Sequence, residues 1–254
     1  MYMVAYYSHN LHFGAIAAAM EGRCADAQAS ADRLADNLRP IAKEMPMVEP
    51  FLGVPLAIRV RCGKWDDLLA MSEPPQSSAQ KVFWLYGRGM ALAARGKTDE
   101  AEALQKQLAE IEKGTSRDEV FMPPVENHSW QVYRIATDIL AARIAVARGD
   151  KSAAISLLRE AVANQDQLLY DEPADWYYPV RESLGGVLLQ TGDVKGAEQV
   201  FRDDLERNPR NPRSLFGLAE ALTRQNRDYE SSWVRQQFET AWQRADLTLK
   251  AEDL

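Results

Sequence analysis

Three histidines are the residues of this chain whose type and spacing are best suited to metal binding or acid–base catalysis. His9 and His12 stand three positions apart, so on a helix they would share one face. His128 follows Glu126 and Asn127 in a stretch that contains a Pro-Pro pair. Converging neutral imidazoles can ligate a transition metal, and imidazoles beside carboxylates can act as general acids or bases. One hypothesis is therefore a metal or small-ligand site, with hydrolytic chemistry, formed by these three histidines.

The sequence lacks the motifs that accompany such chemistry in known enzymes. It contains no His-Glu-x-x-His helix, no Gly-x-Ser-x-Gly nucleophile turn and no glycine-rich phosphate loop. A simpler interpretation is that His9 and His12 hydrogen-bond across a groove or to a neighbouring repeat. In the same interpretation His128 caps or precedes a helix that begins near Ser129. These observations favour a protein without enzymatic activity, cofactor or metal.

Composition narrows the class of protein. The chain has 254 residues, of which 46% are hydrophobic, and its formal net charge is −7. The negative charge argues against nucleic acid as the main partner. No apolar run reaches the roughly 18–20 residues that a membrane span needs, and polar residues interrupt the first 20, so we expect no membrane or signal segment and a cytoplasmic location. Cys24 and Cys62 are too few for a disulfide framework, and we expect them to be small packing residues.

A short pattern that recurs six times organises the chain. Each copy has an apolar stretch of helical spacing, a turn residue, a charged residue and, five positions after the turn, a residue that is small in all copies but the second, which has Leu68. The turn residues are Gly22, Gly63, Gly96, Gly149, Gly192 and Asn226, at spacings of 41, 33, 53, 43 and 34 residues. Gly and Asn tolerate the left-handed backbone that ends a helix. The pattern therefore predicts antiparallel helix pairs.

These pairs resemble the tetratricopeptide-repeat family over about residues 7–246. The resemblance is strongest at Leu184-Gly185…Leu188…Gly192…Ala197…Phe201…Pro209, and it is weakened at Asp204, Arg181 and Asp138, where the family usually has apolar residues. It implies an all-α, right-handed solenoid of about six stacked antiparallel helix pairs with irregular inserts, folded as one domain. The pairs are expected near residues 7–38, 48–73, 80–113, 129–165, 177–209 and 212–249.

Three segments also look like parts of a group of large bacterial tetratricopeptide-repeat proteins. They are Tyr6–Phe13, Met20–Arg23 and Glu172–Trp176, and in that group they lie in the C-terminal half of a longer chain. The resemblance implies that further N-terminal repeats are missing here. No polar cap precedes the first pair, so an alternative is a homo-oligomer formed through that uncapped repeat.

The resemblance also implies where a concave groove lies. In the family, first-helix positions 13, 10, 6, 3 and 2 residues before the turn residue line it. Counting in the first, third and fifth pairs gives His9, His12, Ile16, Ala19 and Met20; Phe83, Tyr86, Met90, Ala93 and Ala94; and Pro179, Glu182, Gly186, Leu189 and Gln190. This predicts a mildly apolar, aromatic groove that lacks the basic pattern with which some members clamp a terminal carboxylate.

Inserts lengthen three of the spacings between turns. Residues 114–128 contain Pro-Pro, residues 169–179 concentrate four aromatics and three carboxylates, and residues 40–50 carry three prolines. Such segments act as structural lids or, alternatively, wall a ligand pocket, in which case Trp176 and Tyr177 would contact the ligand. After the last turn, Tyr229–Leu249 is predicted to form one long helix whose apolar stripe, including Trp233, covers the final pair.

The sequence thus favours a non-catalytic scaffold that binds a protein or peptide segment in its groove. The predicted groove residues are His9, His12, Ile16, Phe83, Tyr86, Met90, Glu182, Trp176 and Tyr177. The alternative is the small-ligand or metal site formed by His9, His12, His128 and the aromatic insert 170–178.

Overall fold

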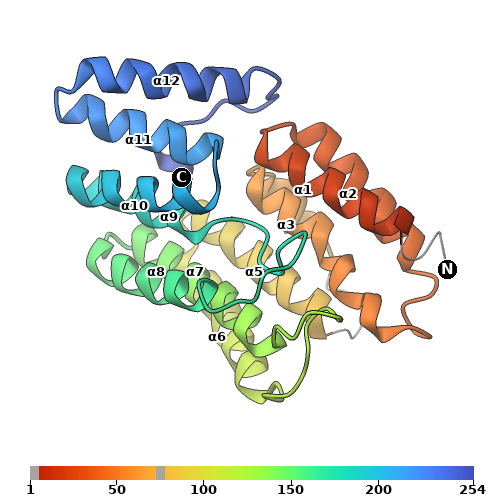
Figure 1. The fold of residues 1–254 in the computed structure, drawn as a ribbon. Helices are drawn as coiled ribbons and strands as arrows, with labels where there is room; N and C mark the ends of the chain where they lie inside the picture. The colour runs from red at the N-terminus through yellow and green to blue at the C-terminus, as the bar shows by residue number, and fades with distance from the viewer. Residues whose placement is uncertain (1–5, 73–77) are drawn as a thin grey trace.

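The computed structural model describes residues 6–72 and 78–254, and within them it contains twelve α-helices and no strand (Figure 1). In chain order the helices are α1 (Ser8–Met20), α2 (Cys24–Leu38), α3 (Val54–Arg61), α4 (Trp65–Ala70), α5 (Ser78–Ala94), α6 (Thr98–Gly114), α7 (Ser129–Ala147), α8 (Lys151–Gln165), α9 (Val180–Thr191), α10 (Val194–Arg207), α11 (Pro212–Arg224) and α12 (Asp228–Trp242). Two 3-10 helices, η2 (Pro46–Gly53) and η3 (Ala251–Asp253), complete the described elements. The predicted all-α class is confirmed.

Successive helices form hairpins, and the hairpins stack on one another. The first helix of each pair packs on the second, and the second packs on the first helix of the next pair (Figure 1). This arrangement is the solenoid that the repeat pattern predicts. Among the described helices, none is both long and apolar enough to cross a bilayer.

The turn between the helices of each pair uses the left-handed backbone, as predicted. The five turn glycines have φ values from 63° to 83°, and Asn226 has a φ of 57°. The residue five positions further on is buried in every pair, and the alanines at four of these positions are completely inaccessible to solvent. A small side chain there lets the second helix approach the first closely.

Phe201 shows how tightly the later hairpins pack. A Cβ atom added to Gly185 of α9 would lie 2.4 Å from the Phe201 ring, and one added to Gly217 of α11 would lie 2.2 Å from it. The ring is fully buried. The two glycines therefore make the room for this aromatic side chain.

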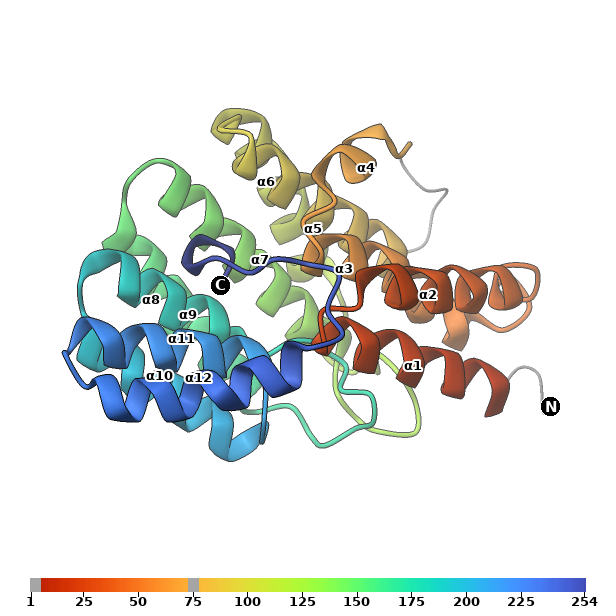
Figure 2. The same ribbon diagram turned by 90° about the horizontal axis from the view of Figure 1, so that it is seen from above.

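The C-terminal part of the chain corrects one prediction. Helix α12 ends at Trp242 rather than near Leu249, and Trp233 is 64% exposed instead of covering the last pair. Phe238 does pack on that pair, with its ring centroid 5.3 Å from that of Phe216. Residues 243–254 leave α12, run past α3 and turn back toward α7 and α9 (Figure 2).

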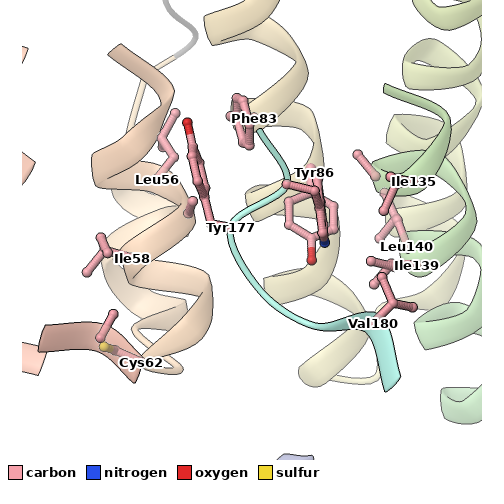
Figure 3. Packing of buried hydrophobic residues seen from close by; sticks show 14 of the residues in the cluster. Leu56, Ile58, Cys62, Phe83, Tyr86, Ile135, Ile139, Leu140, Tyr177 and Val180 are labelled. Atoms are coloured by element: carbon pink, nitrogen blue, oxygen red, sulfur yellow. The ribbon is translucent and has the colours of Figure 1, made fainter. Parts of the chain in front are cut away.

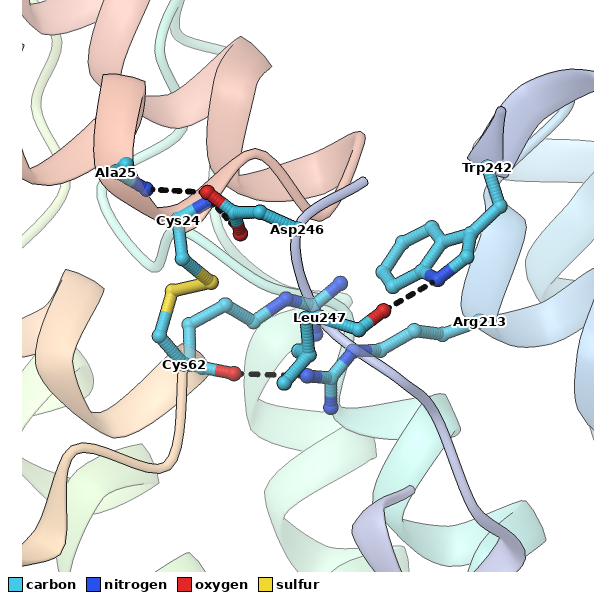
Figure 4. Close-up of a disulfide and its surroundings, with 8 residues drawn as sticks. Cys24, Ala25, Cys62, Arg213, Trp242, Asp246 and Leu247 are labelled. Atoms are coloured by element: carbon cyan, nitrogen blue, oxygen red, sulfur yellow. Dashed lines mark hydrogen bonds between the residues drawn. A yellow bond between two sulfur atoms is a disulfide. The ribbon is translucent and has the colours of Figure 1, made fainter. Parts of the chain in front are cut away.

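The first two hairpins contact the last two directly, through a junction that we call the seam. The Trp242 indole lies against the first turn so closely that a Cβ atom on Gly22 would be 2.4 Å from it. The backbone N–H of Asp246 donates to the Gly22 carbonyl (3.1 Å). The Asp246 carboxylate accepts the N–H groups of Cys24 and Ala25, each at 2.8 Å, and so caps α2 (Figure 4).

A disulfide lies beside the seam. Cys24, the first residue of α2, is bonded to Cys62, which follows α3, and their Cα atoms are 5.9 Å apart (Figure 4). The expectation that both cysteines are unbonded packing residues is therefore wrong. The repeat spacing places both near hairpin turns, but only the stacking of the first two hairpins brings the two turns within bonding distance.

Candidate binding groove

A cavity of about 390 Å³ opens on the concave side of the solenoid. Its walls come mainly from first helices of successive pairs, namely α3, α5, α7, α9 and α11, together with the insert before α9 and residues 247–254, and α4 and α8 contribute one residue each. First helices face inward because the second helix of each hairpin covers their other side. The cavity is therefore a product of the repeat architecture.

One wall of the cavity is aromatic. Trp176, from the insert before α9, contacts the Tyr86 ring edge-on, with ring centroids 5.5 Å apart. Behind them Phe83 and Tyr177 stack with a centroid distance of 5.8 Å, and Tyr177 lies between α3 and α5 (Figure 3). Burial raises the pKa of the Tyr86 and Tyr177 hydroxyls well above their usual range, so both remain neutral.

The insert that carries this wall is fixed by a buried polar contact. The Asn127 side chain donates to the Leu169 carbonyl (3.0 Å) and to the Asp175 carboxylate (2.7 Å), and it accepts the Leu169 N–H (2.7 Å). Asp175 is 1% exposed, and this burial, aided by the charge of Asp171, raises its pKa to about 6. The insert that contains Asn127 therefore holds in place the insert that carries the wall, although the two are far apart in sequence.

Three arginines, one from each of α3, α7 and α11, reach the cavity. Arg61 forms a buried two-pronged ion pair with Glu182, whose second hydrogen bond is 3.0 Å long, and its guanidinium also lies 4.6 Å from the centre of the Tyr178 ring. Arg213 donates to the Arg61 carbonyl (2.7 Å) and to the Asp253 carbonyl (2.8 Å). Burial lowers the pKa of Arg213 to about 9, so it stays charged at neutral pH.

Arg143 differs from the other two arginines. It is half-buried in the cavity wall and has no hydrogen bond or ion pair with any residue in the described ranges 6–72 and 78–254. Burial lowers its pKa, and the nearby Asp253 and Tyr86 oppose that shift. The Tyr178 hydroxyl also lacks a hydrogen-bond partner within the described part of the chain. The cavity therefore offers a cation, Arg143, that is free to bind an anionic group, whereas the unpaired Tyr178 hydroxyl is buried.

A buried polar network supports the floor of the cavity. The Asn211 side chain donates to Glu182 (2.8 Å) and to Asp204 (2.7 Å), and Asp204 also accepts from the Ser214 hydroxyl (2.5 Å). Burial and the neighbouring Glu182 raise the pKa of Asp204. Asp204 is thus fully buried, although its neighbours in the sequence, Arg202, Asp203, Glu206 and Arg207, are charged.

The predicted groove residues fall into three groups. Tyr86, Met90, Trp176 and Glu182 line the cavity. Phe83, Tyr177 and His12 are buried in the aromatic cluster behind it. His9 and Ile16 lie on α1 away from the cavity lining, His9 exposed against Phe13 and Ile16 half-buried.

The three histidines do not come together as ligands. His12 contacts Phe51 and Tyr177 edge-on, and burial, with a smaller effect of His9, lowers its pKa to about 3. The backbone N–H of His128 donates to the Gln131 side chain (3.0 Å) at the start of α7, so His128, not Ser129, is the N-cap residue. Among the described residues, no group of three or more His, Cys, Asp or Glu is arranged to hold a metal ion.

The arginines were missed for an identifiable reason. Applied to the second, fourth and sixth pairs, the same count back from the turn reaches Arg61, Arg143 and Arg213. The groove positions predicted from the sequence come only from the odd-numbered pairs, and these pairs form the aromatic half of the groove. The prediction that the groove is not basic is therefore incomplete, because its two halves differ in chemistry.

Comparison with known proteins supports the repeat architecture. A family model described as tetratricopeptide repeat matches residues 139–204 and again residues 183–231. Together these segments cover the helices from α8 to α11 in full, with parts of α7 and α12. A search of the curated proteins gave no match.

Proposed function

Because the chain belongs to the tetratricopeptide-repeat family, we propose that it is a non-catalytic scaffold that binds a segment of a partner protein in the concave cavity. The observation that carries this proposal is the mixed lining of the cavity. Aromatic side chains on one wall supply apolar contact area, while Arg143 remains available for an anionic group of a ligand. Aromatic and arginine side chains are the types that dominate binding energy at protein interfaces.

The competing hypothesis required His9, His12 and His128 to converge with the aromatic insert. His12 is instead enclosed by aromatic rings, and His128 lies at the start of α7. No observation favours metal or hydrolytic chemistry at these positions, so the scaffold is the function that the geometry supports best.

A peptide-display selection on the purified chain tests this proposal. Peptides that bind the wild type should bind Met90→Ala and Arg143→Ala at least about tenfold more weakly, since both residues line the cavity. Trp233→Ala is the matched control, because Trp233 is exposed on α12 and outside the cavity. If the selected peptides bind all variants equally, the concave cavity is not the binding site.

The disulfide bears on where this scaffold works. Structural disulfides persist in oxidising compartments and are rare in the cytosol. The Cys24–Cys62 bond therefore weighs against the cytoplasmic location predicted from the sequence, and we propose an oxidising compartment instead. Blocking free thiols in intact cells and then tagging the thiols released by reduction would test this. Tags on both cysteines support the proposal, and cysteines blocked before reduction contradict it.

A further inference from the structure

Part of the chain itself, residues 247–254, forms one side of the proposed binding site. The Leu249 and Leu254 side chains are each only 8% exposed, and η3 packs on α9. Leu254 packs directly against the backbone of α9 at Gly186, where an added Cβ atom would lie 2.7 Å from the Leu254 Cβ. The groove position predicted at Gly186 thus contacts a leucine side chain of the same chain.

The charges of this segment complement those of the cavity. Without residues 247–254, the charged side chains that line the cavity are three arginines and Glu182. The segment adds two acidic residues, Glu252 and Asp253, and one lysine. The charge of Asp253 acts on both Arg143 and Arg213, and that of Glu182 also acts on Arg213. The segment therefore brings net negative charge to a net positive surface.

Few contacts attach the segment to the groove. Arg213 donates to the Asp253 carbonyl (2.8 Å), and the Trp242 indole donates to the Leu247 carbonyl (2.9 Å). Two further hydrogen bonds lie within the segment itself, from the Lys250 N–H to the Asp253 carboxylate (2.9 Å) and from the Asp253 N–H to the Lys250 carbonyl (3.0 Å). The Glu252 and Asp253 residues are exposed. Such a segment can dissociate while the helices behind it stay folded.

We propose that residues 247–254 are an intramolecular ligand that occupies the groove until a partner displaces them. The partner that fits is an extended protein segment carrying adjacent carboxylates next to leucine side chains, because it reproduces the negative charge near Arg143 and Arg213 and the leucine contact with Gly186. Tethering gives the internal segment a high effective concentration, which lowers the apparent affinity for any external competitor. This proposal rests on the proposed function.

The test uses a fluorescein-labelled peptide with the sequence of residues 247–254 as the probe. Fluorescence anisotropy compares its affinity for the wild type with that for the variant Leu249→Ser/Leu254→Ser, in which the internal segment loses both of its buried leucines. We expect the variant to bind the probe about tenfold or more tightly than the wild type, because the groove is vacated. Circular dichroism checks that the variant keeps its helices.

A matched probe and a second variant examine the charge argument. A peptide in which the residues equivalent to Glu252 and Asp253 are Gln and Asn should bind the vacated variant at least about fivefold more weakly. Adding Arg143→Ala to the vacated variant should weaken the acidic probe but leave this neutral probe unaffected. Equal binding of the two probes would overturn the assignment of an acidic partner.

Hydrogen exchange on the unmodified chain tests the proposal without relying on variants that have to fold. Amides of residues 247–254 should exchange faster when the probe is added in excess, while those of α9 do not. Exchange that stays unchanged at saturating probe, or equal affinity of wild type and vacated variant, overturns the internal ligand. If display-selected peptides bind the cavity but show no preference for the vacated variant, the scaffold function stands and only this inference fails.

Discussion

The hairpins and the seam are stabilised by contacts between residues whose separations along the sequence differ greatly. Within a hairpin the contacting residues come from neighbouring helices, as when Gly185 and Gly217 enclose Phe201. Across the seam they are far apart in sequence. Cys24 and Asp246 are separated by 222 positions, and Arg61 and Arg213 by 152.

This difference suggests how the stability of the molecule responds to substitutions. In an open solenoid, stability is close to a sum of each repeat and its nearest neighbours, so the two ends are independent. Here Asp246 caps a helix of the first hairpin, and Arg213 binds the second. We therefore expect the ends to be coupled, and variants at the seam to affect distant hairpins that a local defect leaves intact.

The largest expected effect is loss of the disulfide. The double variant Cys24→Ser/Cys62→Ser should lower the free energy of unfolding by about 4 kcal/mol, because the bond closes a loop across a sequence separation of 38. Denaturant unfolding measures it. The wild type in reducing agent should unfold at the same denaturant concentration as the variant. A loss below about 1 kcal/mol would show that the stacking of the first two hairpins already provides this constraint.

The next prediction concerns the contact between the inserts. Asp175 has a pKa near 6 in the folded chain, above its value near 4 in an unfolded chain, so the folded state binds the proton more tightly. Its contribution to stability is therefore full below pH 4 and is lost as the pH rises to 6. Asp175→Asn should match the wild type at pH 4 and be more stable by roughly 1–3 kcal/mol at pH 7.

Urea unfolding at a series of pH values checks this prediction. Asp118→Asn serves as the control, because Asp118 is exposed in the other insert and should change little at any pH. A wild type and an Asp175→Asn variant whose difference in stability is the same at pH 4 and pH 7 would show that Asp175 does not titrate between them.

The contrast between hairpins and seam also explains which features the sequence predicts. Hairpin turns are local, since a residue that tolerates positive φ and a small residue five positions later suffice to place them. The end of α12 is different. Nothing between Trp242 and Leu249 is Gly or Pro, so the local pattern continues as a helix. The contacts that draw the chain away come from Gly22 and Cys24.

The site was predictable to a similar extent. Tyr86, Met90 and Glu182 follow from their distance to a turn, and they line the cavity. The occupancy of the cavity by residues 247–254 does not follow from any periodicity, because that segment lies outside the repeats. Burial of Asp204 likewise depends on partners from α11, which a one-dimensional pattern does not contain.

The smallest expected effect gives the most direct test of the contrast, because it compares two helix caps of the same chemistry. Asp150 caps α8 locally by accepting the Ala153 N–H (3.0 Å), whereas Asp246 caps α2 from the other end of the chain. Replacing either residue with Ala removes a carboxylate from a helix N-terminus and should lower the free energy of unfolding only slightly. Denaturant unfolding should therefore rank the two variants as similar.

Hydrogen exchange should separate these two variants where equilibrium stability does not. In Asp150→Ala, faster exchange should be confined to the first turn of α8, because the lost bond is local. In Asp246→Ala, exchange should rise at the start of α2 and also along residues 247–254, whose path begins at the seam. If Asp246→Ala leaves residues 247–254 as protected as in the wild type, the cap and the groove segment are independent. The seam then does not couple the start of α2 to residues 247–254.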